Sequence, residues 1–162
     1  TVAIAVCARP TDGTPHIEIT KHQSASLGTD WAVEYLVERW PNAAAIVIDG
    51  QSPAMALLPE LLERKVKVTV TNYAEMARAC GMFELAVKGG AIGRWDNPGQ
   101  QALTTALGNA KKRAIGKAGG WGWDRKDPDV DLTPLVAVTL AHFGAMTSKR
   151  KPGRRAKVAV LS

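Results

Sequence analysis

The sequence contains few cysteines, few aromatic residues and no long apolar run. Only 2 of its 162 residues are cysteines, and Cys7 and Cys80 both lie in apolar segments. We expect them to be small core residues in a reducing compartment, not a disulfide or half of a metal site. No stretch approaches the roughly 20 apolar residues of a membrane helix, and no signal peptide is recognisable. We therefore expect no membrane partner.

Acidic residues are missing from residues 149–162, where six of the 21 Lys and Arg lie. The 15 remaining cations balance the 15 Asp and Glu of residues 1–148, so the net charge of +6 belongs to this segment. We expect one folded domain over residues 1–148 and a flexible basic tail over 149–162. Such a tail suits a polyanion, although a merely solvated chain end remains an alternative. The six cations are Lys149, Arg150, Lys151, Arg154, Arg155 and Lys157.

Hydrophobic residues make up 46% of the chain and charged residues 22%, which is typical of a globular domain. The uniformly apolar segments 2–8 and 43–48 predict strands buried on both faces, and the alternating segment 15–22 predicts a hairpin partner for the first. Further strands are predicted at 66–70, 91–95, 111–115 and 120–123. Helices are predicted at 29–40, 52–64, 72–88, 97–109 and 131–146. This order favours an α/β fold, a mixed β-sheet covered by α-helices.

Two aspartates stand where functional acids are often found. Asp49 ends the apolar strand 43–48, and ligands of α/β sheets bind at the carboxyl ends of strands. Asp131 precedes the last predicted helix, which has Pro134 in its first turn. Each has a structural alternative, because Asp49 could cap the helix after Ser52 and Asp131 could be an ordinary N-cap. Together the two carboxylates could converge on hard cations such as Mg²⁺ or Mn²⁺.

Basic residues flank these acids, with Trp121 and Trp123 between them. Cations beside an acidic metal site suit a phosphodiester substrate, whereas the alternative is an exposed hairpin that the cations only solvate. His16 and His22 could share a strand face, but without a third ligand nearby we expect both at the surface. The candidate DNA-binding residues are Lys111, Lys112, Arg113, Lys117, Arg125 and Lys126.

Several short motifs, in this order, resemble the C-terminal nuclease domain of phage terminase large subunits. The resemblance covers residues 1 to about 147 and implies an RNase H-like mixed β-sheet with helices on both faces. The motifs are Thr29–Trp31, Ile46–Gly50, Glu75–Gly81, Lys111–Arg113, and Trp123–Lys126 followed by Asp131–Ala141.

The resemblance implies a two-metal endonuclease, using Mg²⁺ or Mn²⁺, that cuts concatemeric viral DNA during genome packaging. By position, Asp49 matches the second acid of the family and Asp131 the last, while Asp124 and Asp129 could assist. The expected partners are double-stranded DNA, an upstream ATPase domain of the same polypeptide, the small terminase subunit and the portal, in the cytoplasm of a bacterial host.

The first acid of the family lies on a central strand that precedes the segment matching Val2–Ala8. We expect that strand and its Asp upstream of Thr1, so activity of residues 1–162 alone should be impaired. The alternatives to a packaging nuclease are a non-catalytic DNA-binding module and an RNase H-like resolvase.

Overall fold

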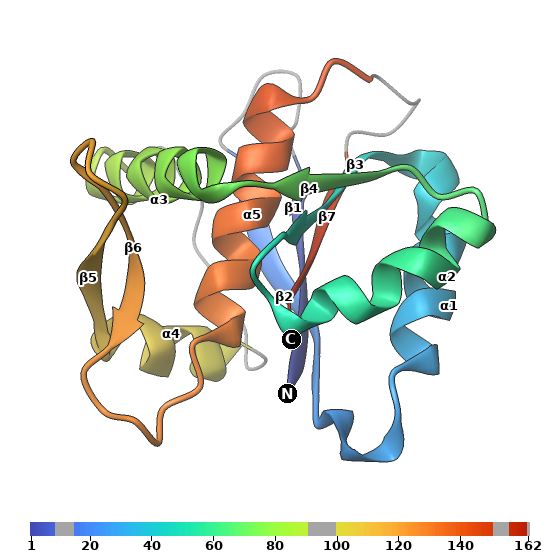
Figure 1. The fold of residues 1–162 in the computed structure, drawn as a ribbon, viewed down its shortest axis with the longest axis horizontal. Helices are drawn as coiled ribbons and strands as arrows, with labels where there is room; N and C mark the ends of the chain where they lie inside the picture. The colour runs from blue at the N-terminus through green and yellow to red at the C-terminus, as the bar shows by residue number, and fades with distance from the viewer. Residues whose placement is uncertain (9–14, 91–99, 151–155, 162) are drawn as a thin grey trace.

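The protein has a mixed α/β fold, seen in a computed structural model that describes residues 1–8, 15–90, 100–150 and 156–161 (Figure 1). Its main sheet has five strands in the order β2-β1-β7-β3-β4. The pairs β2–β1 and β1–β7 are antiparallel, whereas β7–β3 and β3–β4 are parallel. The strands are β1 (Val2–Ala8), β2 (His16–Gln23), β3 (Ala43–Asp49), β4 (Val68–Thr71) and β7 (Ala156–Leu161).

Helices cover both faces of this sheet, as the apolar strands predicted. One face packs against α5 (Thr133–Thr147), with α3 (Tyr73–Lys88) and α4 (Gln101–Gly108) beside it, and the other packs against α1 (Asp30–Arg39) and α2 (Leu58–Glu63). Side chains of β3 alternate between the two cores, so that Val47 faces α5 and Ile48 faces α1 and α2. This alternation explains why the segments that form β1 and β3 are apolar at every position, because both faces of these strands are buried.

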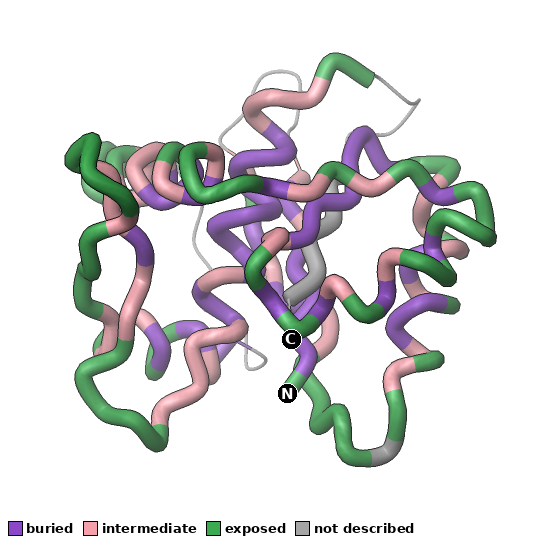
Figure 2. Tube along the Cα trace, in the orientation of Figure 1, coloured by how far each residue is buried: buried purple, intermediate pink, exposed green. Residues whose placement is uncertain are grey.

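Helix α5 lies at the centre of the sheet face that it covers, which we call the α5 face. It packs against β1, β7 and β3, and its residues from Pro134 to Ala145 are almost all buried (Figure 2). Gly144 makes this packing close, because a Cβ at that position would lie 2.8 Å from the Val47 side chain. The uniformly apolar sequence of α5 therefore reflects a helix enclosed by protein on most sides.

The C-terminal strand β7 corrects the expectation of a flexible tail at residues 149–162. Residues 156–161 lie in the middle of the sheet, antiparallel to β1 and parallel to β3. Arg150 is also anchored, because its Nη1 donates to the carbonyl oxygens of Trp40 (3.2 Å) and Ala43 (3.0 Å). The sequence signal for this strand is the segment Ala156–Leu161, which is apolar except for Lys157. It follows directly on a cluster of cations, which is why the charge pattern alone predicts a tail.

A second sheet is formed by the β5–β6 hairpin, β5 (Ala110–Ile115) and β6 (Gly120–Arg125), which packs on the outer side of α3 and α5. Trp123 anchors it, since its indole Nε1 donates to Thr139 Oγ1 of α5 at 3.0 Å. The capping box predicted at Asn72 and Glu75 is confirmed at the start of α3. The strand predicted at 91–95 lies outside the described residues. The predicted helix 52–64 is a 3₁₀ turn, Pro53–Leu57, followed by the short α2.

His142 of α5 gives a test of this packing. The side chain is 4% exposed, lies edge-on to the Phe83 ring, and its Nδ1 has no hydrogen-bond partner among the described residues. Burial lowers the pKa of His142 below its ordinary value of 6.5, so folding keeps the ring neutral. Below that pH the unfolded chain binds a proton that the folded chain does not.

We therefore expect the free energy of unfolding to fall as the pH drops below 6.5, by up to about 1.4 kcal/mol per pH unit from this residue. Urea unfolding between neutral pH and about pH 5 measures the slope. His142→Leu should flatten it, whereas His16→Gln on the exposed end of β2 should not. Equal slopes in the parent and His142→Leu would contradict the prediction.

Candidate functional site

Asp49 is the last residue of β3, on the same sheet face as Val47 and therefore on the α5 face. Its Oδ1 accepts a hydrogen bond from the backbone N–H of Gln51 at 3.0 Å. The alternative of helix capping is not what the structure shows, because Ser52 caps the following turn through the N–H of Ala54. No Lys or Arg among the described residues forms an ion pair with Asp49.

Gly50 holds Asp49 in place through a close backbone contact with β4. The Gly50 N–H donates to the carbonyl oxygen of Thr71 at 3.0 Å, and a Cβ on Gly50 would lie 2.6 Å from that oxygen. Only glycine fits this approach without a shift of the backbone. The pairing places Thr71 beside Asp49, and the Thr71 hydroxyl is buried without a hydrogen-bond partner among the described residues. Asp49 and Thr71 thus bring uncommitted oxygen atoms to one strand end.

Cys80 of α3 reports the electrostatics of this end of β3. Burial raises the pKa of its thiol to about 12, and the negative charge of Asp49 contributes in the same direction. Cys80 is therefore a neutral core residue, as predicted, and not a nucleophile.

Asp131 lies immediately before α5 and is fully engaged by protein groups. Its Oδ2 accepts from Thr1 Oγ1 at 2.6 Å and from His22 Nε2 at 2.8 Å, and its Oδ1 accepts from the Thr133 N–H at 2.9 Å. Burial raises the pKa of the carboxyl, but these hydrogen bonds outweigh it and lower the pKa to about 2. Asp131 is thus a carboxylate that also fastens the start of α5 to β1 and β2.

Asp49 and Asp131 share an end and a face of the sheet, but they are not in contact. Ile48 pairs with Val160 of β7, which pairs with Ile4 of β1, so that the end of β3 lies level with the start of β1. We call this the Asp49 end of the sheet, and both chain ends lie near it in Figure 1. Asp49 ends β3, whereas Asp131 contacts Thr1, the residue before β1, and His22 of β2, so β7 lies between their positions at this end of the sheet. The last described residue of β7 there is Leu161, which pairs with Ala3.

The described residues contain no group of three or more His, Cys, Asp or Glu that could hold a metal ion. Within this part of the chain, Asp49 and Asp131 therefore do not form a metal centre by themselves, and Thr71 is the residue that brings a further oxygen atom beside Asp49.

The two assisting acids do not join this end of the sheet through any contact. Asp124 lies on β6, where its Oδ2 is 4.0 Å from Lys111 Nζ. Asp129 lies in the following loop, where its N–H donates to Asp127 Oδ1 at 2.9 Å. In the described part of the chain, neither lies in a group of potential metal ligands with Asp49 or Asp131.

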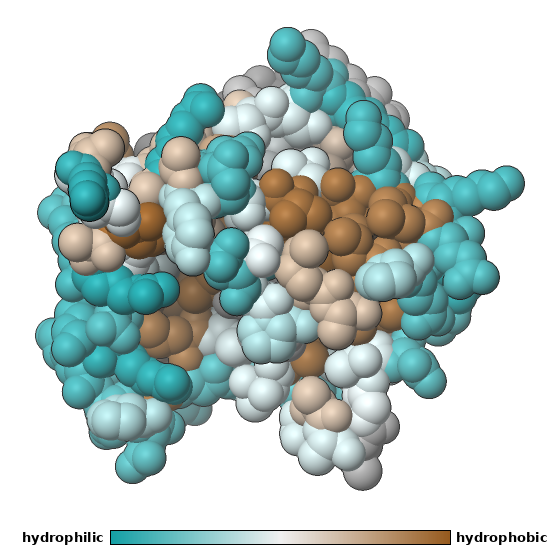
Figure 3. Space-filling model, viewed as in Figure 1, coloured by the Kyte–Doolittle hydropathy of each residue, from teal (hydrophilic) through white to brown (hydrophobic). Residues whose placement is uncertain are grey.

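All six candidate DNA-binding residues are exposed on the β5–β6 hairpin or directly after it, and hydrophilic side chains cover most of that region in Figure 3. Lys112 is committed to Glu84 of α3, with Nζ to Oε2 at 2.8 Å, and Lys111 lies near Asp124. Arg125 donates to the carbonyl oxygen of Val130. The remaining three have no ion pair among the described residues and are the available cations: Arg113, Lys117 and Lys126.

His22 is the site residue that sequence reasoning missed. A register shift between Ile4 and Ala5 brings His22 opposite Ala3, whose side chain belongs to the α5 face. From there the ring reaches Asp131, whereas His16 lies at the other end of β2 beside Glu18. A strict two-residue alternation would have put His22 on the opposite face, so the sequence held no local signal for this contact.

No protein-family model matches the chain, and neither the curated proteins nor the solved structures contain a significant match. Among the described residues, no helix is both long and apolar enough to cross a membrane.

Proposed function

We propose that this chain is a metal-dependent DNA endonuclease domain with an RNase H-like fold, of the kind found in phage terminase large subunits. The observation that carries the proposal is the placement of Asp49 and Asp131 at one end and on one face of a mixed sheet with helices on both sides. Nothing in the spacing of these residues along the chain, 82 positions apart in sequence, requires this placement.

The roles of the two acids differ in this proposal. Asp49, with an uncommitted carboxylate oxygen and Thr71 beside it, is the residue that would hold Mg²⁺ or Mn²⁺. Asp131 would act from the start of α5, where His22 and Thr1 fix its orientation. The bound cation would supply an activated water and stabilise charge on the phosphate. The exposed cations of the hairpin would hold the DNA backbone.

A complete two-metal centre would need a further acid between Asp49 and Asp131. The resemblance places that acid on a central strand next to the one formed by Val2–Ala8, and this central position is occupied here by β7. We therefore propose that full activity needs a donor from outside the described residues. The upstream ATPase domain, the small terminase subunit and the portal remain proposed partners on the same resemblance, and the host cytoplasm the proposed location.

Cleavage of supercoiled plasmid DNA tests the proposal directly. The assay follows residues 1–162 with Mn²⁺, with Mg²⁺ and with EDTA. Nicking that requires a divalent cation is expected. A chain that fails to nick DNA at any cation concentration, or nicks it equally in EDTA, would contradict the proposal.

A non-catalytic DNA-binding module is the second candidate, and the available cations of the hairpin favour it. Arg113→Gln combined with Lys117→Gln should weaken binding of a DNA duplex about tenfold at 0.1 M salt, because two phosphate contacts are lost. The salt slope of the binding constant should fall by about 1.8, from roughly 0.9 per contact. Binding curves over a salt series measure both quantities.

The matched control removes two lysines outside the hairpin, the half-buried Lys21 and the exposed Lys65, as Lys21→Gln with Lys65→Gln. An equal loss of affinity in both double variants would mean that binding follows net charge and not the hairpin. The binding module would be favoured over the nuclease by three results together. DNA binding is lost in the hairpin variant, binding does not depend on divalent cations, and no cleavage is observed.

A further inference from the structure

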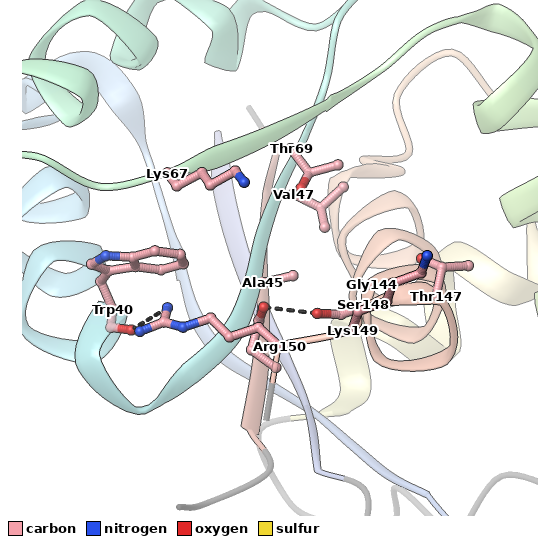
Figure 4. A pocket seen from close by; sticks show the side chains of 11 residues that line it. Trp40, Ala45, Val47, Lys67, Thr69, Gly144, Thr147, Ser148, Lys149 and Arg150 are labelled. Atoms are coloured by element: carbon pink, nitrogen blue, oxygen red, sulfur yellow. Dashed lines mark hydrogen bonds between the residues drawn. The ribbon is translucent and has the colours of Figure 1, made fainter. Parts of the chain in front are cut away.

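A cavity of about 290 Å³ lies at the end of the sheet opposite Asp49, on the α5 face. It is bounded by the start of β3 at Ala44 and Ala45, by Thr69 of the edge strand β4 and Lys67 just before it, and by the end of α5 (Figure 4). Along β3 the cavity runs from Ala44 to Val47, which is two residues, about 7 Å, from Asp49. Neither Asp49 nor Thr71 lines the cavity, so its residues are distinct from those of the candidate metal site.

The fold creates this cavity where α5 stops covering the sheet. Helix α5 packs on β1, β7 and β3, and its close approach at Gly144 brings it against Val47. The next strand, β4, is at the edge of the sheet, so that Thr69 on the same face remains exposed. The space between the end of α5 and β4 is left open to solvent.

The lining of the cavity is cationic. Lys67 reaches it from the residue before β4, and the consecutive Lys149 and Arg150 reach it from the segment after α5; none of the described lining residues is acidic. Neither lysine forms an ion pair with an acid in the described part of the chain. Three cations gathered around one concavity without a counter-charge repel one another, and an anion seated between them would relieve that repulsion.

The hydrogen-bond donors identify the kind of anion. Arg150 is held in place by stacking on the Trp40 ring at 4.0 Å and by donating through Nη1 to the carbonyls of Trp40 and Ala43. Its other guanidinium N–H groups have no acceptor among the described residues, and neither have the ammonium groups of Lys67 and Lys149, so all of them can donate to a ligand. By contrast, the hydroxyls of Thr147 and Ser148 already donate to the carbonyls of Phe143 and Ala44. Three positively charged donors suit an oxyanion that carries more than one negative charge and whose oxygen atoms only accept hydrogen bonds.

We propose that this cavity binds a phosphate group, carried either by a small phosphorylated molecule or by a nucleic acid backbone. The volume exceeds that of the phosphate itself and leaves room for the group to which the phosphate is attached. Arg150 provides a fixed guanidinium, and Lys67, the residue before β4, lies on the opposite side of the cavity. The proposal concerns a site separate from Asp49 and does not depend on nuclease activity.

Calorimetric titration of residues 1–162 with inorganic phosphate, at constant ionic strength, tests this site. Saturable binding of one phosphate is expected, and Lys67→Gln should weaken it about tenfold because one charged hydrogen bond is lost. Lys88→Gln is the matched control, since Lys88 is an exposed lysine at the end of α3 outside the cavity. Lys67 is itself exposed, so its replacement should leave the fold intact.

Two further ligands distinguish the source of the phosphate. A mononucleotide that binds more tightly than phosphate, with the same loss in Lys67→Gln, would identify a small-molecule site. A short DNA duplex whose affinity falls in Lys67→Gln, while a mononucleotide binds no better than phosphate, would identify a backbone contact. Non-saturable phosphate binding, or equal weakening by Lys67→Gln and Lys88→Gln, would overturn the proposal.

Discussion

Replacing Asp49 by asparagine is expected to reduce metal-dependent DNA cleavage by at least about a hundredfold. The substitution keeps the size of the side chain and the hydrogen bond that Oδ1 accepts from Gln51, but it removes the negative charge. A hard cation binds a neutral amide much more weakly than a carboxylate, and charge stabilisation by the cation contributes several kcal/mol to phosphoryl chemistry. Each factor of ten in rate corresponds to about 1.4 kcal/mol. Initial nicking rates of residues 1–162 with Mn²⁺ measure the effect.

Asp30→Asn is the matched control for this substitution. Asp30 is an exposed acid in the first turn of α1, on the other side of the sheet, and its loss changes the net charge equally. Unchanged cleavage in Asp30→Asn and a large loss in Asp49→Asn would assign the effect to the site. A nicking rate in Asp49→Asn equal to that of the parent would remove Asp49 from the mechanism.

Introducing proline at Val158 is expected to remove a large share of the stability of the folded chain. Val158 lies in the middle of β7 and pairs with Val6 of β1 on one side and Ile46 of β3 on the other. Proline has no N–H to donate and does not fit a central strand, so we expect a loss comparable with the cost of proline in a helix interior, about 3 kcal/mol or more. Domains are usually stable by only about 5–15 kcal/mol. Urea unfolding followed by circular dichroism measures the loss.

Val158→Ala is the comparison that separates the effect of losing the backbone N–H from the effect of losing the valine side chain. Alanine keeps the N–H and the freedom to adopt extended backbone angles, so the ladder on both sides of β7 remains intact. We expect Val158→Ala to unfold at a clearly higher urea concentration than Val158→Pro. Similar midpoints for the two variants, both near that of the parent, would contradict the central position of β7.

The core of the fold could be predicted from local patterns. The segments 2–8 and 43–48 are apolar at every position, and both form strands covered by helices on two faces. Asn72 and Glu75 are spaced for a reciprocal cap and form one. These predictions succeeded because hydrophobic alternation and capping depend on residues close together in sequence.

The structure corrected predictions that depend on pairing between segments far apart in the sequence. The segment 156–161 was interpreted as part of a charged tail, but its place between β1 and β3 is decided by two neighbours more than a hundred residues away. The partners of Asp131 follow from a register shift in the β1–β2 pair, which turns His22 toward α5. Neither the strand order nor this register shift can be predicted from the residues nearby in the sequence.

The sequence by itself determined that this protein has an α/β core, with one acid at a strand end, another before a helix, and exposed cations on a hairpin. Only the tertiary structure decided that Asp49 and Asp131 share one end and one face of the sheet, that Leu161 lies between them, and that three cations surround a cavity at the other end. The physical reason is that hydrophobic periodicity is encoded residue by residue, whereas strand order and register are settled by packing among segments far apart in the chain.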